Sequence, residues 1–503
     1  MKFPTGLSVL ALALRGVAAT REECHCCRYL VAEESLQGKV LFADDQLYET
    51  RLASYYSANA ALSPWCMVLP TSTADVSKIA EIFSSHSCPF GMRSGAHSAF
   101  RGSNGVDIGV TVDFAYLNGT TYDAENKIVS IQPGSNWGEA YTVLDPYGVT
   151  AVGGRASVVG VGGFTTGGGY SFHTNSRGFA CDNVVNFEVV LASGEVVNAN
   201  AQENPDLWKA LKGGSGNFGF VTRIDQAVVE STQMWGGFAT YDQSKRDDVF
   251  RAYLRFVDNM ASDPASANIV ALNYDGAEFT LRSILTNTDA LEAPPAFDEY
   301  SAIDTVDSTL RVGAIAELVP EFTGPTPLGL YASWLVGMTK SDLDIMAFID
   351  EKHKEYVASM TAAAPDALFN ILIQFQPVTE SIVRHGAANG GNVLGLEAVV
   401  ADGPALMWLI VFTVDTEENQ DILLPLVMDY RDAINARATQ LGVNSNWDYL
   451  NYAFADQDPI ATYGEENVRF LREVSDKFDP SGVFQKLRKT GFKIPAEEDT
   501  CLD

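Results

Sequence analysis

The chain is poor in basic residues and has no long hydrophobic run. Among its 503 residues, 34 Lys and Arg stand against 64 Asp and Glu, which gives a formal net charge of −30. A chain this acidic repels phosphate backbones and anionic lipid surfaces, so the charge disfavours nucleic acid and membranes as partners. No stretch approaches the about 18 consecutive apolar residues of a membrane helix. Hydrophobic residues are 46% and charged residues 19%, which excludes disorder as the main state.

Several enzyme signatures are also missing. The chain has no G-x-S-x-G nucleophile elbow and no phosphate-loop lysine pattern. Residues 214–219 (Gly-Ser-Gly-Asn-Phe-Gly) match G-x-G-x-x-G letter by letter, but a dinucleotide fingerprint follows a strand and opens a helix. Here a predicted helix precedes the glycines and a predicted strand, 220–224, follows them. We therefore reject a Rossmann site.

The N-terminus has the three regions of a secretory signal peptide. Lys2 precedes an apolar run over 7–14 and small residues at 17–19. We predict a signal peptide over 1–19 and a location outside the cell or in the lumen of the secretory pathway. In that compartment the sequon at Asn118 predicts N-glycosylation.

Seven cysteines fit an oxidising compartment. We expect one or two disulfides near the N-terminus and at least one remaining thiol, with a pairing that sequence alone does not assign. The run Cys24-His25-Cys26-Cys27 offers metal-ligand residue types, but its ligands are crowded and no second cluster completes a zinc site. We predict no metal.

Residue periodicity predicts an α+β protein. Apolar spacing predicts helices that begin near Thr73 and Pro205 and a third over 247–260, while alternation predicts a β-hairpin from 183 to 197. Further strands are expected at 279–285, 371–376 and 408–414. Residues 231–445 therefore read as a sheet with covering helices.

Two segments are rich in glycine and small residues, 93–98 and 148–169. Successive backbone N–H groups in such loops can bind an anion such as a pyrophosphate without a helix fingerprint. The alternative is a pair of tight structural turns.

Four motifs in the same order favour the first interpretation. Arg93-Ser94-Gly95-Ala96-His97-Ser98 closely resembles the R-S-G-G-H-S loop of flavoproteins related to vanillyl-alcohol oxidase, in the berberine-bridge-enzyme-like branch. The segments 153–169, 212–222 and 449–480 are similar to the same family. The likeness is strong over about 60–230 and extends to the C-terminal segment.

The resemblance implies an α+β fold: a PCMH-type FAD-binding domain of two α+β subdomains, an α+β substrate domain with an antiparallel sheet, and a C-terminal return to the FAD domain. We place a lead segment at 20–58, the FAD domain at 59–230, the substrate domain at 231–445, the C-terminal segment at 446–490 and a tail at 491–503. The resemblance also implies that FAD is bonded covalently to His97. The other expected cofactor-binding residues are Arg93, Ser94, Gly95, Ala96, Ser98, Gly154, Ser157, Val159, Gly160, Gly162, Gly163, Gly167, Gly168, Gly169 and Val221.

Three departures from the family pattern and one further position, Val159, refine this expectation. Ala96 replaces the second glycine of the first loop, and Phe164 stands where relatives often have a histidine. Ala156 occupies the position of a cysteine that bonds flavin C6 in some relatives, so we expect one covalent link. Val159 stands at the apparent oxygen gatekeeper position, where valine in relatives permits reaction with dioxygen.

The substrate side offers two pairs of candidates. In a strand over 371–376, Gln374 and Gln376 share a face and could hydrogen-bond a substrate; an exposed polar face is the alternative. By resemblance we choose Tyr452 as the catalytic base and keep Tyr449 as second candidate. A regular strand would point the two tyrosines in opposite directions. His173 is considered as the neighbour that activates the base, or as a core histidine.

These observations predict an FAD-linked oxidase. A small organic substrate of the secondary-metabolite kind would lose a hydride to the flavin, and dioxygen would reoxidise it and yield hydrogen peroxide. The alternatives are an oligosaccharide oxidase, which Ala156 disfavours, and a flavin-scaffolded cyclase with little net redox chemistry.

Overall fold

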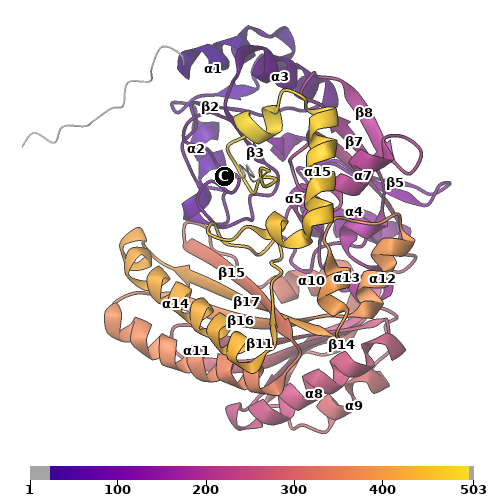
Figure 1. Ribbon diagram of the computed structural model, residues 1–503, viewed down its shortest axis with the longest axis vertical. Helices are drawn as coiled ribbons and strands as arrows, with labels where there is room; N and C mark the ends of the chain where they lie inside the picture. Colours follow the sequence, from indigo (N-terminus) through magenta and orange to yellow (C-terminus); the bar gives the residue numbers. More distant parts are fainter. Residues whose placement is uncertain (1–22, 498–503) are drawn as a thin grey trace, which may run out of the picture.

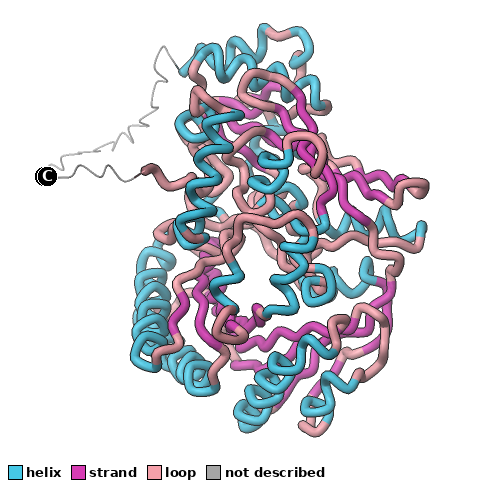
Figure 2. Tube along the Cα trace, turned by 45° about the vertical axis from the view of Figure 1, so that its right-hand side comes forward, coloured by secondary structure: helices cyan, strands magenta, loops and turns pink. Residues whose placement is uncertain are grey.

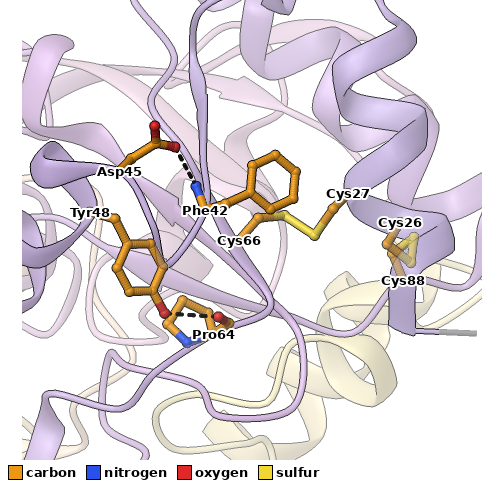
Figure 3. Close-up of a disulfide and its surroundings, with 8 residues drawn as sticks. All are labelled: Cys26, Cys27, Phe42, Asp45, Tyr48, Pro64, Cys66 and Cys88. Atoms are coloured by element: carbon orange, nitrogen blue, oxygen red, sulfur yellow. Dashed lines mark hydrogen bonds between the residues drawn. A yellow bond between two sulfur atoms is a disulfide. The ribbon is translucent and has the colours of Figure 1, made fainter. Parts of the chain in front are cut away.

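The computed structural model describes residues 23–497. The predicted signal peptide and Cys501 lie outside the described residues. Short elements open the described part of the chain. Two disulfides fasten its first helix: Cys27–Cys66 joins it to a strand of the first sheet, and Cys26–Cys88 joins it to the connection that leads into the strand at Phe90 (Figure 3). The disulfides use two cysteines of the Cys24–Cys27 run and so remove them as metal ligands, while Cys181 is a buried free thiol. The elements of this part are α1 (Glu23–Ala32), β1 (Val40–Leu41) and α2 (Gln46–Leu52).

The first subdomain is a four-stranded sheet in the order β1-β2-β4-β3. Its strands β2, β4 and β3 are parallel. The helix α3 buries Val76, Ile79 and Phe83 as its apolar spacing predicts, but Ser72, one residue before the expected Thr73, caps it by accepting from the Asp75 N–H. The bounds are β2 (Cys66–Val68), α3 (Thr73–His86), β3 (Phe90–Arg93) and β4 (Val110–Asp113).

The second subdomain is a five-stranded antiparallel sheet in the order β5-β6-β9-β7-β8. The predicted hairpin is β7 with β8, and the strand expected after the glycines of 214–219 is β9. Its strands are β5 (Thr120–Asp123), β6 (Ile128–Ile131), β7 (Val184–Val190), β8 (Val196–Asn200) and β9 (Phe220–Ala227). Its helices are α4 (Trp137–Leu144), α5 (Val161–Thr166), α6 (Thr174–Arg177) and α7 (Pro205–Leu211).

A nine-stranded antiparallel sheet takes all its strands from residues 233–445. Its path is β13-β10-β12-β11-β16-β17-β15-β18, with β14 paired to β10. The strands are β10 (Gln233–Tyr241), β11 (Ser266–Tyr274), β12 (Phe279–Asn287), β13 (Asp307–Ser308), β14 (Arg311–Ala314), β15 (Tyr331–Lys340), β16 (Phe369–Val378), β17 (Ala405–Val414) and β18 (Asn444–Ser445).

Helices cover the outer face of this sheet, and the two subdomains lie over its other face (Figures 1 and 2). The helix α8 buries Val249, Tyr253 and Phe256 on the stripe that the sequence predicts. The helices of this part are α8 (Arg246–Asn259), α9 (Asp298–Ser301), α10 (Ile315–Thr323), α11 (Leu343–Ala363), α12 (Glu380–Ala388), α13 (Leu396–Val400) and α14 (Glu417–Leu441).

The C-terminal segment returns to the first two subdomains, as expected. Helix α15 (Glu465–Phe478) lies beside α7, and Lys477 forms an ion pair with Asp206 at 2.6 Å. Further on, Arg488 forms a parallel bridge with Phe90 of β3. The mixed architecture confirms the predicted α+β class. Within residues 23–497, no helix is both long enough and apolar enough to cross a membrane.

Candidate active site

A cavity of about 430 Å³ lies between the glycine-rich loops and the inner face of the nine-stranded sheet, a size within the usual range of ligand pockets. The loops and the sheet come from segments far apart in the chain, so the cavity exists only in the folded protein. Its wall comprises parts of 92–104, 155–172, 215–221, 322–326, 450–452 and 488–492, with residues of β11, β12, β15, β16 and β17.

The first glycine-rich loop lies on this wall. Ser94, Gly95, Ala96, His97 and Ser98 all line the cavity. Ala96 adopts φ +53°, the left-handed conformation in which alanine is less favourable than glycine. The loop is fixed by contact with the second loop, since a Cβ on Gly95 would overlap the backbone of Gly160.

Arg93, an expected cofactor contact, points elsewhere. Its buried guanidinium lies 3.4 Å from the Asp113 carboxylate and packs over the Tyr55 ring. It also donates to Ser54 Oγ at 2.6 Å, and Arg93 does not line the cavity. In this structure the side chain supports the loop from behind, where the Asp113 carboxylate compensates its buried charge.

His97 is held by two aromatic side chains. Its ring stacks on Tyr56 with centroids 4.0 Å apart and meets the edge of Trp334 at 5.6 Å. The Tyr56 N–H donates to Ala96 O at 3.1 Å, and Trp334 Nε1 donates to Tyr56 Oη at 3.2 Å. Burial lowers the pKa of His97 to about 4. The imidazole is therefore neutral at pH 7.

The second glycine-rich segment divides into residues that face the cavity and residues that support the fold. Gly154 packs against Trp137, and the Gly169 N–H donates to Tyr449 Oη. These supporting residues show why the segment contains so many glycines, since bulkier side chains would overlap their neighbours. The predicted residues that line the cavity are Val159, Gly160, Gly162 and Gly163, joined by Arg155, Ala156 and Phe164; those that do not are Gly154, Ser157, Gly167, Gly168 and Gly169.

The segment 212–222 contributes Ser215, Gly216, Gly219 and Val221 to the cavity wall. The helix α7 precedes these glycines and the strand β9 follows them. The order is the reverse of a Rossmann motif, as the sequence indicates.

The two tyrosine candidates have different surroundings. Residues 450–452 form a turn, closed by a bond from Tyr452 N to Tyr449 O at 2.9 Å, so the strand geometry assumed for this segment does not apply. The rings meet edge to face with centroids 4.9 Å apart. Tyr449 is 1% exposed and its Oη accepts from the Gly169 and Tyr170 N–H groups, both at 2.9 Å. Tyr452 lines the cavity and Tyr449 does not.

Arg155 joins Tyr452 to the polar face of β16. Its Nη2 donates to Tyr452 Oη at 2.9 Å and to Gln376 Oε1. Its guanidinium lies 4.4 Å from the Tyr170 ring centroid, a favourable cation–π geometry.

The two glutamines share a face, as predicted. Gln376 Nε2 donates to Gln374 Oε1 at 3.3 Å. Gln374 lines the cavity, whereas Gln376 is fully buried and holds Arg155. His173, which we considered as the neighbour of the base, does not line the cavity; it is buried beside Arg177 and its pKa is lowered to about 3.

The cavity is electrostatically positive in an otherwise acidic protein. Two guanidinium groups, Arg155 and Arg488, line it, and no carboxylate does among the described residues. Asn104 also lines it, and its Oδ1 is buried without a partner among residues 23–497. An extended ligand with negative charge and a hydrogen-bond donor, such as FAD, therefore fits the residues present.

Sequence reasoning missed many lining residues, among them Tyr56, Asn104, Arg155, Trp334 and Arg488. Arg155 carried a usable signal, because it is the only charged residue between positions 148 and 169. The other four lie outside every glycine-rich motif.

Comparison with known proteins places the chain among flavin enzymes. Residues 64–200 match the model of an FAD binding domain. The FAD-dependent monooxygenase drtC of Aspergillus calidoustus is 36% identical over 476 residues, which cover 93% of this chain and 90% of the relative. The FAD-dependent monooxygenase sdcF of Emericella nidulans is 37% identical over 478 residues and covers 93% and 98%.

Solved structures show the same fold at low sequence identity. The 6-hydroxy-D-nicotine oxidase of Arthrobacter nicotinovorans superposes with a TM-score of 0.74 at 20% identity, covering 92% of this chain and 98% of that one. Berberine bridge enzyme gives 0.72 at 17% identity, with 95% and 99% covered. A glucooligosaccharide oxidase from Acremonium strictum, with 6-S-cysteinyl, 8α-N1-histidyl FAD, gives 0.73 at 17% identity, with 94% and 99% covered.

Proposed function

The chain belongs to the berberine-bridge-enzyme-like FAD-linked oxidoreductases, and from this premise we propose that it is an oxidase of a small, largely apolar organic substrate. In the proposed reaction the substrate loses a hydride to FAD and a proton to Tyr452, and dioxygen takes up the electrons as hydrogen peroxide. The observation that carries the proposal is the contact of Arg155 with Tyr452 Oη in a cavity that the flavin loops also line.

The residues of the chain have separate tasks in this reaction. Bound FAD supplies the hydride acceptor and the reaction with dioxygen. As a phenolate, Tyr452 Oη takes the proton from a substrate hydroxyl. The Arg155 guanidinium donates to this oxygen and stabilises the negative charge of the phenolate. We assign Gln374, which lines the cavity, to orient the substrate by a hydrogen bond.

The apolar wall supports the substrate class. Side chains from β11, β12, β16 and β17 face the cavity with Ile269, Ile284, Leu372 and Val411. Such a wall favours a hydrophobic ring system over a polyhydroxylated sugar, because it leaves sugar hydroxyls without partners. This wall and Ala156 both count against an oligosaccharide oxidase.

We further propose that His97 is the single covalent attachment point of FAD. Its neutral imidazole in the cavity wall can act as a nucleophile, and Ala156 in the same wall offers no thiol for a second link. The two disulfides and the exposed Asn118 sequon support a protein of the secretory pathway that carries a glycan.

A second candidate is a monooxygenase, which the names of the fungal relatives favour. The two reactions differ in the fate of oxygen: an oxidase releases both atoms as hydrogen peroxide, and a monooxygenase transfers one atom to the product. A cyclase without net redox chemistry consumes no dioxygen.

The deciding experiment uses the holoenzyme with a panel of cyclic alcohols, phenols and glucose oligomers under isotopically labelled dioxygen. We expect a cyclic alcohol or phenol to give one hydrogen peroxide per dioxygen consumed and an unlabelled product. Label in the product would establish the monooxygenase, turnover of a substrate without oxygen uptake would establish the cyclase, and oxidation of glucose oligomers alone would overturn the substrate class. Tyr452→Phe serves as the control that the observed turnover occurs at this site.

A further inference from the structure

The cavity contains a second cationic group at the segment that closes it near the C-terminus. Arg488 is 3% exposed and follows the short π-helical turn Val483–Leu487. Backbone bonds hold the segment in place: Lys489 N donates to Phe90 O at 2.7 Å, and Gly491 N donates to Gly102 O at 3.0 Å. The Arg488 side chain is therefore fixed between β3 and the loop that follows the first glycine-rich motif.

Every protein acceptor of Arg488 is neutral. Its Nη2 donates to Asn217 Oδ1 at 2.6 Å and to Phe492 O at 2.9 Å, and its Nε donates to Phe484 O at 3.3 Å. No carboxylate oxygen of residues 23–497 lies within 4.0 Å of the Arg488 guanidinium, the distance that defines an ion pair. A buried cation without a counter-charge is energetically costly, and sites of this kind are completed by an anion.

The remaining nitrogen, Nη1, lies beside two glycines of the cavity wall. It has no hydrogen bond to any described residue, and a Cβ on either Gly216 or Gly491 would lie 3.3 Å from it. Both glycines line the cavity, so their missing side chains leave the approach to Nη1 open. Asn104, with its unpartnered Oδ1, belongs to the same wall.

Arg488 is the buried cation of this region. Burial lowers its pKa to about 9, which leaves it charged at pH 7. The neighbouring Lys493 has its pKa lowered to about 5 by burial and by the Arg488 and Lys489 cations, so it is neutral. Lys489 itself is exposed and donates to Lys486 O.

We propose that Arg488 Nη1 binds a phosphate of the ADP half of FAD and that the C-terminal segment thereby completes the cofactor site. The diphosphate is the anionic part of this cofactor and supplies the counter-charge that the protein lacks at Arg488. The proposal depends on FAD as the cofactor; it does not depend on the oxidase reaction, on Tyr452 or on the covalent link.

The test measures cofactor release from holoprotein that carries His97→Ala, so that FAD is not retained covalently. In this background we compare native Arg488 with Arg488→Gln, and use Lys489→Gln as the matched control that removes one exposed positive charge at the next position. FAD dissociation constants are obtained by dilution and flavin fluorescence. ADP and adenosine are titrated as competitors.

Loss of a hydrogen bond to a charged group corresponds to about a 10- to 100-fold change in affinity. We expect Arg488→Gln to weaken FAD and ADP by this factor and to leave adenosine unchanged, with Lys489→Gln equal to the parent. Unchanged FAD release, or an equal loss for ADP and adenosine, would overturn the assignment. If Arg488→Gln does not fold, the parent decides alone: ADP must compete at least about 10-fold better than adenosine, and equal competition refutes the phosphate contact.

Discussion

Replacing Tyr452 by Phe should slow flavin reduction and leave the fold intact. The change removes one oxygen from the cavity wall, and that oxygen accepts a single bond, from Arg155 Nη2 at 2.9 Å. Loss of a positioned base typically lowers a rate by about 10²–10⁴-fold, or roughly 3–5 kcal/mol in activation free energy. The lost hydrogen bond should cost at most about 1.5–3 kcal/mol of stability, because water in the cavity can replace the oxygen.

Tyr449→Phe is the matched control, since it removes the same atom from the adjacent ring. Its Oη accepts from two buried N–H groups, those of Gly169 and Tyr170. Leaving both unsatisfied should cost about 2–6 kcal/mol of unfolding free energy. We expect the two variants to separate: Tyr452→Phe should affect reduction, and Tyr449→Phe should affect stability.

Arg155→Met tests whether Arg155 acts through the tyrosine. Alone, it should slow reduction by about 10- to 150-fold, the equivalent of one charge-assisted hydrogen bond of about 1.5–3 kcal/mol. In the Tyr452→Phe background the same change should have a much smaller effect, because the charge that it stabilises is absent.

The assay is anaerobic stopped-flow reduction of the flavin, with urea unfolding of each variant. Near-normal reduction by Tyr452→Phe would remove this tyrosine from the mechanism. Fully additive effects of Arg155→Met and Tyr452→Phe would mean instead that Arg155 contacts the substrate directly.

Three further predictions concern the cofactor and the fold. His97→Ala should give a denatured protein without flavin colour, whereas the unsubstituted protein should stay yellow after acid precipitation. Because the pKa of His97 is about 4, the imidazole is neutral at every pH from about 5 to 8. Covalent incorporation of flavin that declines around the ordinary histidine pKa of about 6.5 would contradict this environment. Val159→Leu should slow flavin reoxidation more than reduction, since it adds a methylene to the cavity wall; equal oxygen rates in stopped flow would refute the steric argument. Removing the Cys26–Cys88 disulfide by paired alanine substitution, which opens a 62-residue separation, should lower the unfolding free energy by about 4 kcal/mol on the chain-entropy model, and an unchanged urea midpoint would exclude that model here.

The sequence predicted most local elements because their signals are local. Apolar spacing located α3 and α8, and alternation located the β7–β8 hairpin and the strand with Gln374 and Gln376 on one face. Ten of the sixteen residues predicted as cofactor contacts line the cavity. In these cases residues that are close in sequence are enough to show the period of the secondary structure or the need for a small side chain.

The C-terminal tyrosines show the limit of such reasoning. A regular strand would have separated Tyr449 and Tyr452, but a turn brings their rings together, and their surroundings differ. Tyr449 is buried and accepts from the Gly169 and Tyr170 N–H groups, whereas Tyr452 lines the cavity. The surroundings of Tyr449 and of Tyr452 come mainly from distant parts of the chain.

The sequence by itself determined the α+β class, the acidic charge, the loop that carries His97 and the glycines that let two loops touch. Only the tertiary structure decided which charged groups line the cavity. Arg93 belongs to the recognised motif but turns to Asp113, whereas Arg155 and Arg488, 333 positions apart, both face one cavity. A guanidinium acts on whatever lies within a few ångströms of it, and that neighbourhood is set by the packing of three sheets and a returning C-terminal segment, which no single stretch of sequence encodes.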